Sequence, residues 1–206
     1  MSDNVFLDAL DDQRIVAIVR ESSADDALAL GERLIAAGIR LIEVSLVTPN
    51  AIAVVASLSA SAAGSPTQIG AGTVLRADDV DRVVDVGGRF ILSPVFDEQV
   101  VRAAVSANLA VVPGCATPSE LLRATDLGAA AVKVFPASVW SPGSLRDALQ
   151  ALPGLLCLPT GGVKREHLTA WLDAGAAGVG LGSVIGKLDD DGIARLLEET
   201  RGHAKR

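Results

Sequence analysis

A lysine lies in the middle of an otherwise apolar run, Ala-Val-Lys-Val-Phe at residues 131–135. Parallel strands buried on both faces are continuous runs of apolar residues, so Lys133 would be costly to desolvate in such a strand. Desolvation disfavours the ammonium form, and a neutral lysine is a nucleophile toward ketones. The run therefore indicates a Schiff-base chemistry. The alternative is an edge strand whose lysine is directed toward water.

A carboxylate interrupts a second apolar run, where Glu43 lies between Ile42 and Val44. Burial raises the pKa of an inward carboxyl group, and beside a neutral lysine such a group could move protons during the reaction. The alternative is a structural ion pair of Glu43 with Lys133 or Arg20.

The elements that must position these residues follow a repeat of helix, glycine and apolar run. Helical stretches end at Gly38, Gly87, Gly128 and Gly175, and each is followed by a short apolar segment. Glycine ends helices because it adopts the left-handed conformation at little cost. Asn108 takes the same place before another apolar segment. The segments that we predict to be strands are residues 15–19, 41–44, 68–71, 90–92, 110–112, 131–135, 155–158 and 178–181.

Eight strands that alternate with amphipathic helices predict a single domain over residues 1–206, folded as a (β/α)₈ TIM barrel of the α/β class. Residues 4–11 are expected to form an extra N-terminal helix against the barrel floor. A doubly wound open sheet is the alternative architecture. We expect helices to be capped by Ser23, Asp97, Thr117 and Ser141.

Composition excludes several classes of function. The net charge is −7 and the sequence has no basic run, so we expect neither nucleic acid nor a membrane as a partner. With two histidines and no tyrosine, a histidine-centred triad, a multi-histidine metal site and a tyrosine acid are disfavoured, and no metal or cofactor is expected. The first ten residues do not resemble a signal peptide. The two cysteines, far apart in sequence, are typical of a reduced cytoplasmic protein.

Polar residues and glycines gather where the predicted strands end. In a (β/α)₈ barrel, the chemistry takes place at this carboxyl-terminal face. The pattern therefore favours a Lys133 side chain that points into the barrel mouth. The candidate site residues, in chain order, are Arg20, Glu43, Thr73, Pro94, Lys133, Thr160, Gly161, Gly162, Gly182 and Ser183.

Glycines after the last two predicted strands indicate a phosphate site. Gly161-Gly162 and Gly182-Ser183 would let backbone amides approach an anion closely, at the strands where such barrels hold phosphate. Tight turns are the alternative explanation. Thr73 could donate a hydrogen bond to a substrate carboxylate. Arg20 could pair with a carboxylate or a phosphate, or could be an ordinary surface arginine.

Five segments, in the same order along nearly the whole chain, resemble the class I aldolases of 2-keto-3-deoxy-6-phospho-sugar acids, the KDPG/KHG aldolase family. The resemblance implies a homotrimeric barrel that needs no cofactor and cleaves a sugar-acid phosphate to pyruvate and D-glyceraldehyde 3-phosphate. It also implies that Lys133 forms the Schiff base, Glu43 is the general acid/base and Thr73 contacts the carboxylate. Gly161, Gly162 and Ser183 would hold the phosphate. The matching segments are residues 38–46, 70–75, 113–117, 132–137 and 159–163.

Two positions bear on the epimer at C4 of the substrate. Members of this family that act on the gluconate epimer carry an arginine four residues after the glutamate, where this chain has Val47. Residues 46–50 instead resemble members that act on the galactonate epimer. Thr160, in contrast, matches the gluconate type. One hydrogen bond to the C4 hydroxyl can control this choice. We favour the galactonate epimer, with activity on both epimers as the alternative.

Three other functions remain open at this point. An aldolase for non-phosphorylated sugar acids would depend only weakly on the 6-phosphate. A phosphate-binding barrel isomerase would use Glu43 as a base and would leave Lys133 as a cation. A barrel that binds sugar phosphates without turnover would be stabilised by ligand and would release no pyruvate.

Overall fold

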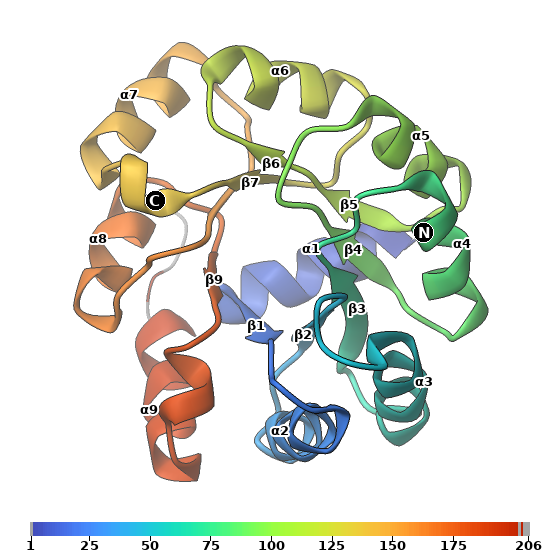
Figure 1. The fold of residues 1–206 in the computed structure, drawn as a ribbon. Coiled ribbons are helices and arrows are strands. Elements are labelled where there is room, and N and C mark those ends of the chain that lie inside the picture. The colour runs from blue at the N-terminus through green and yellow to red at the C-terminus, as the bar shows by residue number, and fades with distance from the viewer. Residues whose placement is uncertain (1, 202, 204–206) are drawn as a thin grey trace.

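The computed structural model describes residues 2–201 and 203, with side chains from residue 5 onward. The chain has an α/β fold whose parallel sheet is curled, and Figure 1 shows helices α2 to α9 arranged around the strands, with α1 lying across them. The strands are β1 Ile15–Val19, β2 Leu41–Ser45, β3 Gln68–Gly72, β4 Phe90–Leu92, β5 Ala110–Val112, β6 Gly114–Cys115, β7 Val132–Val134, β8 Cys157–Pro159 and β9 Val179–Leu181. The α-helices are α1 Ser2–Gln13, α2 Ala24–Ala36, α3 Ala51–Ser61, α4 Ala77–Asp85, α5 Glu98–Ser106, α6 Pro118–Asp126, α7 Pro142–Ala151, α8 Leu168–Asp173 and α9 Asp190–Arg201, and three short 3₁₀ turns are η1 Ala137–Val139, η2 Arg165–His167 and η3 Ile185–Lys187.

The strands pair in two parallel sheets. Six strands pair in the order β5-β4-β3-β2-β1-β9, and three pair in the order β6-β7-β8. The first five strands follow chain order without reversal, and the last strand lies beside the first. A doubly wound sheet needs a point where the strand order reverses. That alternative is therefore wrong.

One strand break was not expected from the sequence. The run after Asn108 continues past Val112 as a second short strand, β6, and Pro113 separates the two. Proline has no backbone N–H and cannot donate to a strand ladder, so pairing is interrupted there. The Pro113 carbonyl still accepts a hydrogen bond from Lys133 N at 2.9 Å, which connects the break to β7.

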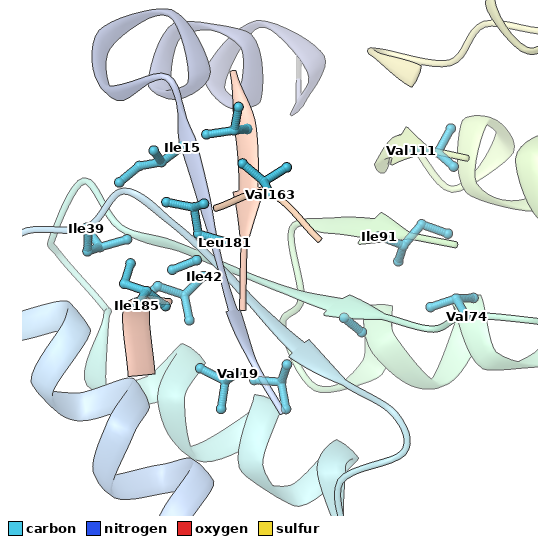
Figure 2. Packing of buried hydrophobic residues seen from close by; sticks show 14 of the residues in the cluster. Ile15, Val19, Ile39, Ile42, Val74, Ile91, Val111, Val163, Leu181 and Ile185 are labelled. Carbon is cyan, nitrogen blue, oxygen red and sulfur yellow. The ribbon is translucent and has the colours of Figure 1, made fainter. Parts of the chain in front are cut away.

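Alternate residues of each strand face two different apolar layers. Ile15 and Val19 of β1, Ile42 of β2 and Ile91 of β4 belong to the larger core between strands and helices (Figure 2). Their neighbours along the strands, such as Leu41, belong to a smaller inner core together with residues of α1. Each fully buried Leu or Ile side chain contributes about 1.5–3 kcal/mol through burial. Because side chains alternate between the two faces along a strand, Glu43 and Lys133 point to the inner side.

Helix capping agrees with the sequence. The four expected caps all accept hydrogen bonds from the first turn of their helices, and Thr117 and Ser141 form reciprocal capping boxes. Each such cap is worth about 1 kcal/mol. α1 packs against β2, β5 and α9. No helix in the described part of the chain is long and apolar enough to cross a membrane.

Candidate active site

A cavity of about 740 Å³ lies at the carboxyl ends of the strands, and all ten candidate residues line it. They come from segments that are distant in sequence but adjacent in the sheets, because parallel strands present their carboxyl ends on one side. The cavity is also lined by residues that were not predicted from the sequence to belong to the site, among them Glu21, Ser45, Phe135 and Lys187.

Lys133 is buried at the centre of a sheet. Its strand, β7, lies between β6 and β8, so the interpretation of an edge strand is wrong. The residue is only 5% exposed. Its Nζ atom lies 4.8 Å from the centroid of the Phe135 ring, a cation–π distance that orients the amine within the cavity.

Glu43 is the most deeply buried carboxylate of the cavity, with 1% of the residue exposed. Burial raises the pKa of the Glu43 carboxyl group, and the charges of Lys133 and Arg20 act in the opposite direction. Its Oε2 atom accepts no hydrogen bond from any described group. Glu43 is also in none of the ion pairs within the described part of the chain, so its carboxylate is available for proton transfer rather than held in a structural pair.

Gly72 creates the space that the Glu43 carboxylate occupies. Ser45 and Gly72 are register partners in the β2–β3 ladder, which places Gly72 beside the end of β2. A Cβ atom built at Gly72 would overlap Oε1, Cδ and Cγ of Glu43. Any side chain at this position would therefore displace the carboxylate. In the sequence, Gly72 belongs to the matching segment 70–75, but no role was predicted for it.

Thr73 is held in an unusual backbone conformation. Its φ angle is 60°, in the left-handed region that is costly for a β-branched residue. Its Oγ1 atom lies 2.9 Å from Ser45 Oγ, at hydrogen-bond distance. Strained residues of this kind cluster at functional sites. The two hydroxyl groups therefore lie together on the cavity wall. Of these two, only the Thr73 hydroxyl was predicted from the sequence to donate a hydrogen bond to a carboxylate.

The loop after β8 adopts a conformation that suits glycine. Gly161 and Gly162 have φ angles of 82° and 87°. A Cβ atom at Gly161 would come within 2.8 Å of the Phe135 ring. The loop is fixed because the Gly161 carbonyl accepts a hydrogen bond from Ser138 N at 3.1 Å. Glycine at both positions therefore follows from backbone conformation and close packing, as well as from any bound anion.

Backbone donors are left available on the two segments that follow β8 and β9. The N–H groups of Gly162 and Ser183 donate no hydrogen bond to any described residue. Gly182 starts the turn that leads into η3, where its carbonyl accepts from Ile185 N at 3.0 Å. Thr160 is 3% exposed and its hydroxyl donates to the Leu158 carbonyl at 3.1 Å, which leaves its oxygen as an acceptor. This end of the cavity can hold an anion through main-chain donors.

Charges on the lining favour an anionic ligand. Three cations line the cavity, namely Arg20, Lys133 and Lys187, against the two carboxylates Glu21 and Glu43. Within the described residues, no group of three or more His, Cys, Asp or Glu side chains could hold a metal ion. The chemistry that the geometry offers is that of an amine and a carboxylate in one buried space.

Comparisons with known proteins agree with this arrangement. The sequence model of the KDPG and KHG aldolases matches residues 7–196. The chain belongs to the KDPG and KHG aldolase family. This aldolase is therefore a carbon–carbon lyase. It is 38% identical over 170 residues to the 2-dehydro-3-deoxy-6-phosphogalactonate aldolase of Escherichia coli strain K12, a match that covers 82% of each chain.

Solved structures of relatives share the fold of the aldolase. A native KDPGal structure superimposes with a TM-score of 0.81 at 33% identity, covering 92% of this chain and 93% of that one. The KDPG aldolase of Legionella pneumophila superimposes with a TM-score of 0.74 at 28% identity, covering 100% of this chain and 98% of that one. That relative was solved with pyruvate captured at low pH as a covalent carbinolamine intermediate.

Val47 lies outside the cavity of the aldolase. The residue is 53% exposed and lines a neighbouring cleft formed by the segments after β2 and β3. Thr73 lines both spaces. Of the two positions that bear on the epimer, only Thr160 therefore faces the site directly.

Proposed function

We propose that the aldolase cleaves a 2-keto-3-deoxy-6-phospho-sugar acid to pyruvate and D-glyceraldehyde 3-phosphate, with the galactonate epimer preferred and the gluconate epimer as a second substrate. The observation that carries the proposal is that one cavity contains buried Lys133 and buried Glu43, whose Oε2 atom accepts no hydrogen bond from any described group. The relative from Escherichia coli that acts on the galactonate epimer supports the choice of epimer.

The reaction begins at Lys133. Once it has given up a proton, the Nζ amine adds to the C2 ketone of the substrate to give a carbinolamine, and loss of water then gives a protonated imine. The cationic imine is the electron sink for the later bond cleavage. The carbinolamine of pyruvate in the Legionella pneumophila relative supports this step.

Glu43 moves the protons of the cleavage. Its carboxylate removes the C4 hydroxyl proton while the C3–C4 bond breaks, and the bonding electrons flow to the iminium to form an enamine. The aldehyde leaves, Glu43 returns the proton to C3 of the enamine, and water hydrolyses the resulting imine to free pyruvate. Its raised pKa makes Glu43 a stronger base than an exposed carboxylate, and the nearby positive charges favour its ionised form.

The remaining lining residues bind the two anionic ends of the substrate. The Ser45 and Thr73 hydroxyl groups hold the carboxylate, with Arg20 as the nearby cation. The main-chain donors of Gly162 and Ser183, on the turns formed by Gly161 and Gly182, hold the phosphate. Pro94 and Thr160 form walls of the cavity, which leaves Thr160 to discriminate at C4.

We further propose that the two sheets act as one closed eight-stranded barrel with α1 as an additional helix at its floor. The bridge between Thr160 and Gly180 joins β8 to β9 on one side. On the other side, Ala130 N donates to the Val111 carbonyl at 3.0 Å. We also propose a homotrimer, which light scattering during gel filtration would test.

A cytoplasmic location is the last part of the proposal. Burial raises the pKa of the Cys115 and Cys157 thiols to about 12, so both groups stay protonated and unreactive. Thiols of this kind are typical packing residues of reduced compartments.

Pyruvate release from each phosphorylated epimer, measured beside Lys133→Met, tests the proposed function. We expect cleavage of both epimers, a higher kcat/KM for the galactonate epimer, and no cleavage by the variant. If neither epimer gives pyruvate, the proposal is wrong. If the corresponding acids without the 6-phosphate react equally well, the substrate class is wrong.

A further inference from the structure

A second cavity, of about 850 Å³, lies at the other end of the strands. Arg40, directly before β2, and Arg89, directly before β4, both line it. The end of α3 and the beginning of β3 complete its wall. The Arg40–Arg89 cavity is therefore on the amino-terminal side of the strands, away from Lys133 and Glu43 at their carboxyl-terminal side.

Charge on the Arg40–Arg89 cavity is positive in an acidic protein. Its lining contains two guanidinium groups and no carboxylate, whereas the whole chain has a net charge of −7. Arg89 makes no ion pair and no side-chain hydrogen bond with any described residue. Arg40 pairs through Nη1 with Asp12 Oδ2 at 3.2 Å. The guanidinium of Arg89 is thus left for a ligand.

Two further donors in the cavity wall have no acceptor. Nε of Arg40 and Oγ of Ser59 are buried and unpartnered among the described residues. Buried polar atoms are almost always hydrogen-bonded, so each unpaired donor indicates a missing acceptor. Both residues line the same cavity.

The backbone holds the two arginines in place. Arg40 N donates to Gln13 Oε1 at 2.8 Å, and the Arg40 carbonyl accepts from Gln68 N at 2.7 Å. Arg89 N donates to the Ile69 carbonyl at 2.8 Å. Both side chains therefore start from fixed backbone positions at the amino-terminal side of the sheet.

We propose that the Arg40–Arg89 cavity is a second binding site, which takes a phosphate or carboxylate group carried on a small carbon skeleton. Guanidinium groups bind both kinds of oxyanion through paired N–H donors. The apolar part of the wall, which includes Ala56, Ala60 and Val86, contacts the skeleton. The site is independent of the proposed aldolase reaction because no residue lines both cavities.

Titration calorimetry with inorganic phosphate and with succinate tests this site. Because the active site also offers anion donors, the titrations use wild type and Ser183→Glu, whose added charge repels anions from the active site. We expect Ser183→Glu to retain one anion per chain. Adding Arg89→Ala should weaken that binding about tenfold or more, as the loss of a charged hydrogen-bond donor does. Adding Arg40→Ala should do the same.

Arg102→Ala is the matched control, because Arg102 is an exposed arginine that pairs with Glu98 outside the cavity. It should leave the affinity unchanged. Arg89→Ala alone should leave the melting temperature and pyruvate release unchanged, since Arg89 is exposed and outside the active site. Binding of phosphate alone or succinate alone supports the site and identifies the oxyanion.

Two results would overturn the proposal. One is the absence of binding of either probe to Ser183→Glu at millimolar concentrations. The other is binding that stays within twofold when Arg89 and Arg40 are replaced. Failure of the proposed aldolase reaction would instead be seen as a loss of pyruvate release, which this titration does not measure.

Discussion

Replacing Gly72 by alanine should disable the aldolase through Glu43. The new methyl group would occupy the space of the Glu43 carboxylate. Glu43 is buried, so its side chain can respond only by rotating within the cavity or by shifting β2 against β3. A misplacement of about 1 Å at a reacting group costs on the order of 100-fold in rate. We therefore expect kcat to fall about 100-fold.

Stability should fall as well, because overpacking a buried position costs about 1–3 kcal/mol. The assay compares kcat, KM and thermal unfolding of Gly72→Ala with those of Gly143→Ala. Gly143 lies in the first turn of α7, where an added methyl group would have only Ser141 Oγ nearby, at 3.6 Å. The control should keep full activity. It should also unfold at an equal or higher temperature, since alanine favours the helix.

Gly72→Ala leaves the main-chain donors proposed to hold the phosphate, at Gly162 and Ser183, unchanged. KM should therefore change far less than kcat. A Gly72→Ala enzyme with kcat within twofold of wild type would refute the reasoning. Such a result would mean that the position of the Glu43 carboxylate does not limit the reaction.

Three other substitutions test separate parts of the account. Glu43→Gln should abolish cleavage and raise the melting temperature at neutral pH. Because burial raises the pKa of Glu43 above 4.5, the ionised carboxylate destabilises the folded protein increasingly as pH rises. The gain in melting temperature should therefore shrink toward pH 4.5, as melting curves at several pH values would show. Thr73→Gly should relieve about 1 kcal/mol of left-handed strain while raising KM, as denaturant unfolding and kinetics would show. Gly180→Ala should push the Thr160 side chain away and change the ratio of kcat/KM for the two epimers; an unchanged ratio would remove Thr160 from discrimination at C4.

Local signals in the sequence were sufficient to predict the strands other than β6, and to select the ten candidate residues. Glycine and asparagine at helix ends separated the helices from the apolar runs, and the polar residues gathered at the strand ends predicted that Lys133 points into the barrel mouth. The ten candidate residues share one cavity because parallel strands end on one side. Their catalytic and binding roles stay predictions until variants are measured.

Features that depend on contacts between distant segments could not be predicted in this way. The role of Gly72 comes from a carboxylate on the neighbouring strand, and no residue near Gly72 in sequence signals it. Val47 occupies a position that was predicted to bear on the epimer, yet it lines the neighbouring cleft and not the cavity that contains Lys133. The Arg40–Arg89 cavity combines residues that precede two different strands, and only the fold shows that they face one space.

Covalent trapping at Lys133 tests the central claim most directly. The aldolase would be incubated with pyruvate and borohydride, digested, and mapped by mass spectrometry. The account predicts a reduced pyruvate adduct on the peptide that contains Lys133, with activity lost in proportion to labelling. An active enzyme that gains no adduct, or an adduct that maps to Lys164 or Lys187 instead, would contradict it.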